Sequence, residues 1–187
     1  MTQTSAHMHA LSLDDNGLPV ITTERLRLRA PKADDLDATI AFLMSERASG
    51  IGGPHSLGAA WRVFATICGH WQVCGYGLFV VTRKGDDTPL AIVGPWTPGD
   101  WPETEVGWSV IDPATEGTGI ATEAAQAVIR FAFDELGWKT IVHYIREGNT
   151  RSIRLAEKLG ATLDVDAPQP DGKPCLVYRQ PAPEVAA

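Results

Sequence analysis

The sequence of 187 residues predicts one mixed α/β domain. Apolar and polar residues alternate with period two over residues 25–29, which predicts a strand with one buried face. Apolar residues recur at three- and four-residue spacing between residues 121 and 136, which predicts a long amphipathic helix. The second half follows the order strand, helix, strand, helix and indicates a parallel crossover, whereas an earlier hairpin indicates antiparallel pairing. The central sheet should therefore be mixed.

In the first half, acidic residues in a first turn mark where the first helix begins. A polar turn at residues 84–87 separates two apolar runs and indicates a hairpin. Three prolines and two tryptophans then predict a loop. The expected elements are a strand over 25–29, a helix from 31, a helix over 57 to about 67, strands over 77–81 and 89–93, and a loop over 94–103.

In the second half, glycines mark the ends of both predicted helices, and Asn149 caps the start of the second one. The expected elements are a strand over 105–111, a helix over 118–136, a strand over 140–145, a helix from 149 to about 159, and a strand over 176–178. Residues 1–19 and 182–187 lack periodicity and are predicted to be tails. The domain itself is expected to span residues 20–181.

Composition excludes several classes of protein. Apolar residues make up 44% and charged residues 21%, which is ordinary for a globular domain, and the net charge of −7 argues against nucleic-acid or anionic-membrane binding. The three cysteines form no CxxC pair, so we expect neither a disulfide framework nor a metal site, and a reduced, cytoplasmic setting is the default. Residues 63–82 carry no charge, but glycines interrupt them, so we predict no membrane span.

The most informative stretch is residues 116–124, which joins the strand over 105–111 to the long helix. Gly117 and Gly119 allow a tight turn there that points several backbone N–H groups at one place. The first N–H groups of a helix have no internal partners and lie at the positive end of its dipole. This stretch therefore predicts a binding site for a phosphate or pyrophosphate group.

Three cofactor classes could use such a loop. A P-loop nucleotide site requires a lysine at the helix start, and this chain has no lysine between Lys84 and Lys139. A dinucleotide site of the Rossmann type requires a third glycine and an early position in the chain, and neither is found here. Coenzyme A is the third class.

Several motifs together resemble the GNAT superfamily of N-acetyltransferases, and particularly its RimJ/RimL-type branch. Residues 116–121 (EGTGIA) match the last three informative positions of the family's pyrophosphate motif Q/R-x-x-G-x-G/A. The further matches, which extend the resemblance over residues 21–178, are TERLRL at 23–28, EVGW at 105–108, TEAA at 122–125, NTRS at 149–152 and EKLGA at 157–161. The resemblance implies a mixed, mostly antiparallel central sheet with one parallel splayed pair, flanked by helices.

The resemblance also implies where acetyl-CoA would bind. The loop amides would hold its pyrophosphate, and its pantetheine arm would run along residues 108–111, where the N–H of Val110 would stabilise the oxyanion. Asn149 would cap its helix while its amide reaches the cofactor, and Ser152 is the candidate acid for the thiolate or else an ordinary first-turn serine. The implied cofactor-binding residues are Trp108, Val110, Gly117, Thr118, Gly119, Ile120, Ala121, Thr122, Asn149 and Ser152.

Two positions depart from the family pattern. Glu116 stands where the family has Gln or Arg, and its carboxylate would repel a pyrophosphate unless it turns aside. Ala156 stands where many members have a tyrosine acid, which leaves Ser152 as the candidate.

The candidate general base is Glu105, acting directly or through water, although a solvated strand carboxylate is an equal interpretation. His143 is a second candidate, but a lone strand histidine is more often a packing residue. Trp96 and Trp101 precede the strand of Glu105, and they either line the acceptor pocket or pack on the sheet.

The sequence therefore predicts direct transfer of an acetyl group to a primary amine in a ternary complex. The acceptor would be a protein or peptide N-terminus or a small amine. A catalytically inactive coenzyme A sensor is the alternative, and a nucleotide-binding oxidoreductase is a third interpretation. An exposed sheet edge would permit a homodimer.

Overall fold

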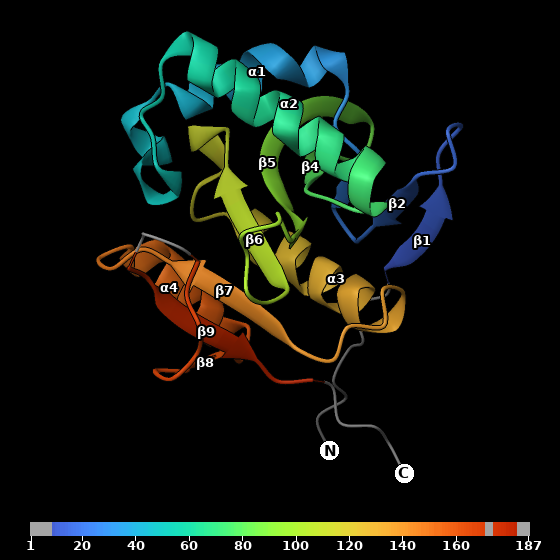
Figure 1. Ribbon diagram of the computed structural model, residues 1–187. Coiled ribbons are helices and arrows are strands. Elements are labelled where there is room, and N and C mark those ends of the chain that lie inside the picture. The colour runs from blue at the N-terminus through green and yellow to red at the C-terminus, as the bar shows by residue number, and fades with distance from the viewer. Residues whose placement is uncertain (1–8, 171–173, 183–187) are drawn as a thin grey trace.

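The computed structural model describes residues 9–170 and 174–182. These residues form a sheet in the order β1-β2-β3-β4-β5-β6-β7-β9-β8, in which β6 and β7 are the one parallel pair (Figure 1). The strands are β1 (Ala10–Leu13), β2 (Pro19–Thr22), β3 (Leu26–Arg29), β4 (Phe79–Arg83), β5 (Asp86–Trp96), β6 (Glu105–Val110), β7 (Ile141–Ile145), β8 (Thr162–Leu163) and β9 (Leu176–Gln180). The predicted fold class, a mostly antiparallel sheet with a parallel pair, is confirmed.

Helices cover both faces of the sheet. The α-helices are α1 (Leu36–Leu43), α2 (Leu57–Cys74), α3 (Ile120–Asp134) and α4 (Thr150–Lys158), and the 3-10 helices are η1 (Ala33–Asp35), η2 (Glu46–Ile51) and η3 (Pro113–Thr115). Helices α1 and α2 lie together over one face, and α3 lies on the other (Figure 1). A large core between the sheet and α3 and a smaller core beneath α1 and α2 bury the apolar side chains.

The parallel pair opens soon after it forms. Glu105 and Val142 are the only residues of β6 and β7 in register, and the amide of Val142 donates to the carbonyl of Thr104 over 2.9 Å. On its other side, β7 pairs with β9 along its whole length. The strand ends of β6 and β7 therefore leave a gap in the sheet, and this gap positions the candidate site.

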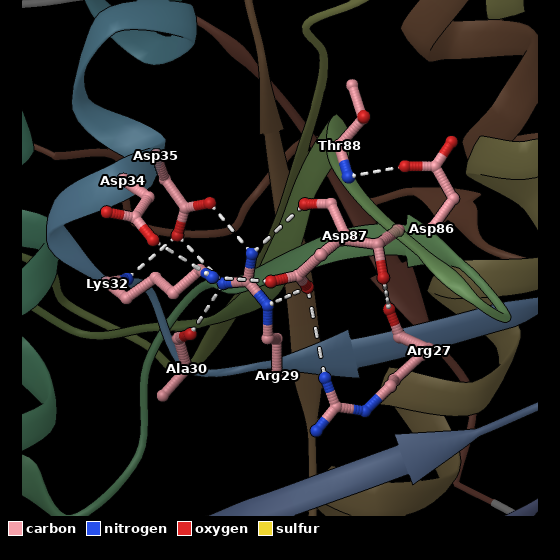
Figure 2. A network of polar contacts seen from close by, with 10 residues as sticks. Arg27, Arg29, Ala30, Lys32, Asp34, Asp35, Asp86, Asp87 and Thr88 are labelled. Atoms are coloured by element: carbon pink, nitrogen blue, oxygen red, sulfur yellow. Dashed lines mark hydrogen bonds and ion pairs between the residues drawn. The ribbon is translucent and has the colours of Figure 1, made fainter.

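A buried ion-pair network ties the hairpin of β4 and β5 to the start of the first helix (Figure 2). The guanidinium of Arg29 donates to both carboxylate oxygens of Asp35 over 2.8 Å each and to Asp87 over 2.7 Å. Burial alone would lower the pKa of Arg29, but the bonds to the two carboxylates raise it above its ordinary value. Because none of its side chains lines the cleft at the gap between β6 and β7, we assign this network to stability.

Three sequence expectations differ from the structure. Residues 10–13 of the expected tail form β1, which pairs with β2, while residues 1–8 and 183–187 lie outside the described residues. Helix α2 continues beyond residue 67 to Cys74 and ends where Gly75 takes a left-handed φ of 76°. Strand β5 continues into the expected loop as far as Trp96 because residues 94–96 pair with β6. Pairing with neighbouring strands, which has no local signal, accounts for the first and the last difference.

Candidate active site

A cleft of about 1200 Å³ opens where β6 and β7 separate. Its walls are the end of β6, the loop from η3 into α3, the loop from β7 into α4, and η2. Five cationic side chains line it, namely Arg47, Arg146, Arg151, Arg154 and Lys158, against three acidic ones, Glu46, Glu116 and Glu147. The chain as a whole carries a charge of −7, so this cleft is a local cationic region suited to an anionic ligand.

The glycine loop forms one wall with its backbone. Gly117 and Gly119 have φ values of 75° and 84°, a conformation that other residues rarely adopt, and Gly119 is the N-cap of α3. The cleft is lined by Gly117, Gly119, Ile120, Ala121 and Thr122. The remaining loop residue, Thr118, differs because its N–H donates to the carbonyl of Thr115 over 3.3 Å. Its amide is therefore engaged within the loop, whereas the first-turn amides of α3 are oriented for an anion.

The carboxylate of Glu116 is held by two arginines. Arg47 of η2 donates to one oxygen over 2.8 Å, and Arg151 of α4 donates to the other. Arg47 also donates to the carbonyl oxygens of Val110 and Ile111 over 2.8 and 2.6 Å. The expected repulsion between Glu116 and a phosphate is thus offset by two positive charges, and the end of β6 is fixed by the same contact.

The edge of β6 points backbone groups into the gap. Ile111 donates its N–H to the carbonyl of Leu90 over 2.8 Å, so Leu90 and Ile111 form a hydrogen-bonded pair between β5 and β6. Bonded and non-bonded pairs alternate in an antiparallel ladder, so Val110 and Trp108 direct their N–H and C=O groups away from β5. The geometry therefore leaves the N–H groups of Trp108 and Val110 facing the cleft, where a pantetheine arm could pair with them.

The first turn of α4 forms the opposite wall. Asn149 caps this helix, because its side-chain oxygen accepts the N–H of Ser152 over 3.2 Å. The hydroxyl oxygen of Ser152 accepts a hydrogen bond from the indole N–H of Trp108 over 3.2 Å. This contact joins the two walls and leaves the hydroxyl hydrogen of Ser152 free to be donated. Ala156 lies fully buried one turn further on.

Glu105 lies at the point where β6 and β7 part and is 8% exposed. Burial raises its pKa to about 7, although hydrogen bonds from Trp101 and from the backbone of Tyr144 oppose the shift. The indole N–H of Trp101 donates to its carboxylate over 2.5 Å. The other carboxylate oxygen leans over Gly107, where an added Cβ would lie only 3.4 Å away. Glu105 therefore titrates in the range that a general base needs, but it is outside the cleft lining.

Trp96 and Trp101 lie with Glu105 on the face that α1 and α2 cover. Trp96 is in register with Glu105 and stacks on His70 of α2 with ring centroids 4.7 Å apart. Trp101 packs edge-on to Tyr144 with centroids 6.2 Å apart. The structure thus brings both tryptophans beside the candidate base, on the opposite side of the strand from the Ser152 hydroxyl, and neither lines the cleft.

His143 is 1% exposed and packs against the Trp108 ring, with centroids 4.6 Å apart. Its Nδ1 lies 2.6 Å from the carbonyl oxygen of Val106. Burial lowers the pKa of this imidazole, and these contacts support the packing interpretation.

Arg47 is the residue that sequence reasoning missed. Its partners lie 63 to 69 residues away along the chain, and its helix η2 was not expected at all. A short polar 3-10 segment has no hydrophobic periodicity, so the sequence held no local signal that could have identified it.

The family described as "Acetyltransferase (GNAT) domain" matches residues 25–162. A curated L-2,4-diaminobutyric acid acetyltransferase from Streptomyces avermitilis is 32% identical over 93 residues, which span 47% of this chain and 52% of that protein. The chain therefore spans about half the length of this curated relative.

Two solved structures extend the likeness over most of the chain. An acetyltransferase from Agrobacterium tumefaciens is 34% identical with a TM-score of 0.82, covering 92% of this chain and 98% of that one. A putative GNAT-family acetyltransferase from Bordetella pertussis is 25% identical with a TM-score of 0.70, covering 86% and 98%. RimL-type structures match at 19% identity or less, which shows a shared fold only, so the RimJ/RimL-type branch stays a prediction.

Proposed function

Because this chain belongs to the GNAT acetyltransferase family, we propose that it transfers an acetyl group from acetyl-CoA to a primary amine in a ternary complex. The observation that carries the proposal is the cleft itself. Free amides at the start of α3 face the same space as the N–H groups of Trp108 and Val110. The amides at the start of α3 suit the phosphates of the cofactor, and the N–H groups of β6 suit its thioester carbonyl.

Acetyl-CoA supplies an activated thioester carbonyl that an amine can attack. The N–H of Val110 would stabilise the negative charge that develops on the carbonyl oxygen. The hydroxyl of Ser152 would donate a proton to the departing sulfur as the C–S bond breaks, since only its oxygen is engaged, by Trp108. The attacking nitrogen would return a proton to Ser152 as the neutral amide forms, so the serine ends the step unchanged. Binding both substrates at the same time removes the need for a covalent enzyme intermediate.

The amine must lose its proton before it attacks, and Glu105 is the proposed base. At about 3.3 Å per residue, its Cα lies roughly 16 Å along the strand from that of Val110, so we propose that water carries the proton to its carboxylate. The carboxylate leans over Gly107 toward that end of β6. A pKa of about 7 allows it to accept a proton near neutral pH.

The proposed acceptor is a small amine or a protein or peptide N-terminus. The diaminobutyric acid acetyltransferase acts on a small amine, and the branch resemblance favours a protein or peptide N-terminus. Trp96 and Trp101 are half-buried beside the Glu105 carboxylate, and aromatic rings next to a carboxylate suit either kind of cation. Within residues 9–170 and 174–182, no helix has the length and apolar character that crossing a bilayer demands. A cytoplasmic setting and a homodimer stay predictions.

Acetyl-CoA turnover with a thiol reagent, measured across a panel of N-terminal peptides, amino acids and polyamines, tests the function. We expect release of coenzyme A with at least one class of amine, together with a thermal shift on adding coenzyme A. A thermal shift without turnover on any amine would favour the sensor. A protein that responds to NAD(H) and not to coenzyme A would refute the proposal.

A further inference from the structure

Two motifs that the proposed chemistry leaves without a role meet in the structure. One is the segment TERLRL at residues 23–28, and the other is Glu123 in the first turn of α3. One carboxylate oxygen of Glu123 accepts the hydroxyl of Thr23 over 2.6 Å and the backbone N–H of Arg25 over 3.0 Å. The other oxygen accepts Nε of Arg25 over 2.6 Å. A single carboxylate thus holds both residues next to the glycine loop.

The guanidinium of Arg25 reaches onward to the loop itself. Its Nη1 donates to the carbonyl oxygen of Thr118 over 3.2 Å. In a trans peptide the C=O and the following N–H point in opposite directions. The N–H of Gly119 therefore points away from Arg25. Because Gly119 lines the cleft and Arg25 does not, this N–H is directed to the cleft side of the loop.

This contact matters because the loop is intrinsically adaptable. Glycines flank Thr118 on both sides, and glycine reaches more backbone conformations than any other residue. An unheld peptide between Thr118 and Gly119 could rotate and turn a carbonyl oxygen toward a phosphate. Arg25 opposes that rotation from behind the loop, and Glu123 in turn limits the motion of Arg25.

We propose that Arg25, held by Glu123, is a positioning residue that orients the Gly119 amide toward the pyrophosphate of coenzyme A. The proposal rests on coenzyme A being the ligand of the cleft. Arg25 acts through the backbone of the loop, so it affects the phosphates of the cofactor and has no direct part in acetyl transfer.

The test compares a ligand with phosphates and a ligand without them. We expect Arg25→Ala to raise the KM for acetyl-CoA about tenfold, as for the loss of one well-oriented bond to an anion. The KM for S-acetyl-pantetheine, which has no phosphate, should stay within twofold, and so should kcat at saturating acetyl-CoA. Arg25→Lys keeps the charge but cannot reach both Glu123 and Thr118, so it should behave like Arg25→Ala.

Arg27→Ala is the matched control, because Arg27 lies two residues further along the chain, in β3, and its ion pair is to Asp87 over 3.9 Å and not to Glu123 or the loop. Glu123→Gln keeps the size of the side chain but places an NH2 donor against Nε of Arg25, so it should raise the KM for acetyl-CoA in the same way, and it serves if Arg25→Ala does not fold. An equal rise in KM for acetyl-CoA and S-acetyl-pantetheine, or no rise in the KM for acetyl-CoA, would overturn the positioning role. A wild-type protein that binds no coenzyme A would instead remove the proposed function, and this inference with it.

Discussion

Replacing Glu105 with glutamine should stabilise the protein at alkaline pH while it lowers activity. The side chain is buried beside Trp101, and its pKa is raised from 4.5 to about 7. Glutamine keeps an oxygen that can accept the Trp101 indole N–H, but it carries no charge that burial could penalise. The substitution therefore isolates the cost of a buried carboxylate.

The sign and the size of the stability difference between wild type and Glu105→Gln both follow from the raised pKa of Glu105. Between about pH 4.5 and 7 the folded state binds a proton that the unfolded state has lost, so stability falls as the pH rises through this window. The shift of roughly 2.5 units at 1.36 kcal/mol per unit gives an upper limit of about 3.4 kcal/mol. Glu105→Gln escapes this penalty, so its advantage should be near zero at pH 4 and about 3 kcal/mol at pH 8.5.

Urea unfolding of wild type and Glu105→Gln at several pH values between 4 and 8.5 measures this difference. Glu24→Gln is a control, because Glu24 is exposed in the turn between β2 and β3 and its loss should change stability little at any pH. A difference between wild type and Glu105→Gln that stays constant with pH would refute the raised pKa. The same variant should lose about 10²-fold in kcat/KM, the size expected for removing a general base. In the wild type kcat/KM should rise with pH near 7 as Glu105 ionises, and this rise should be absent in the variant.

Three further outcomes follow from contacts in the site and core. Ser152→Ala should lower kcat about 10²-fold while the Kd for coenzyme A changes less than twofold, and an unchanged kcat would remove Ser152 from the mechanism. Trp101→Phe removes a hydrogen bond that lowers the pKa of Glu105, so the pH at which kcat/KM rises should move above 7. A shift of this rise to lower pH would contradict the contact. Asp35→Asn should destabilise the fold by about 3 kcal/mol in urea unfolding, because it leaves the buried charge of Arg29 with Asp87 as its remaining carboxylate partner.

The local parts of this site were predictable from sequence. Gly117 and Gly119 signal their backbone conformation by residue type, and Asn149 signals a cap by its place before a helical run. The mixed sheet followed from the order of local patterns. These features depend on near neighbours in the chain, so the residues themselves carry the information.

The remaining parts depend on contacts between distant segments. The two arginines that neutralise Glu116 come from η2 and from α4, and the sequence around residue 116 gives no signal that predicts them. The raised pKa of Glu105 depends on its burial in the folded sheet. From sequence alone, a charged residue in a strand is expected to be solvated. Strand β1 was missed because all four of its residues are exposed, which removes the alternation that marks a strand.

The central claim is that the backbone amides of the glycine loop bind the phosphates of coenzyme A. An amide NMR titration with coenzyme A tests it most directly. We predict saturable shifts at Gly117, Gly119, Ile120, Ala121 and Thr122, with a smaller change at Thr118, whose amide already donates to Thr115. Saturable binding that leaves these amides unshifted and perturbs another part of the chain would contradict the claim.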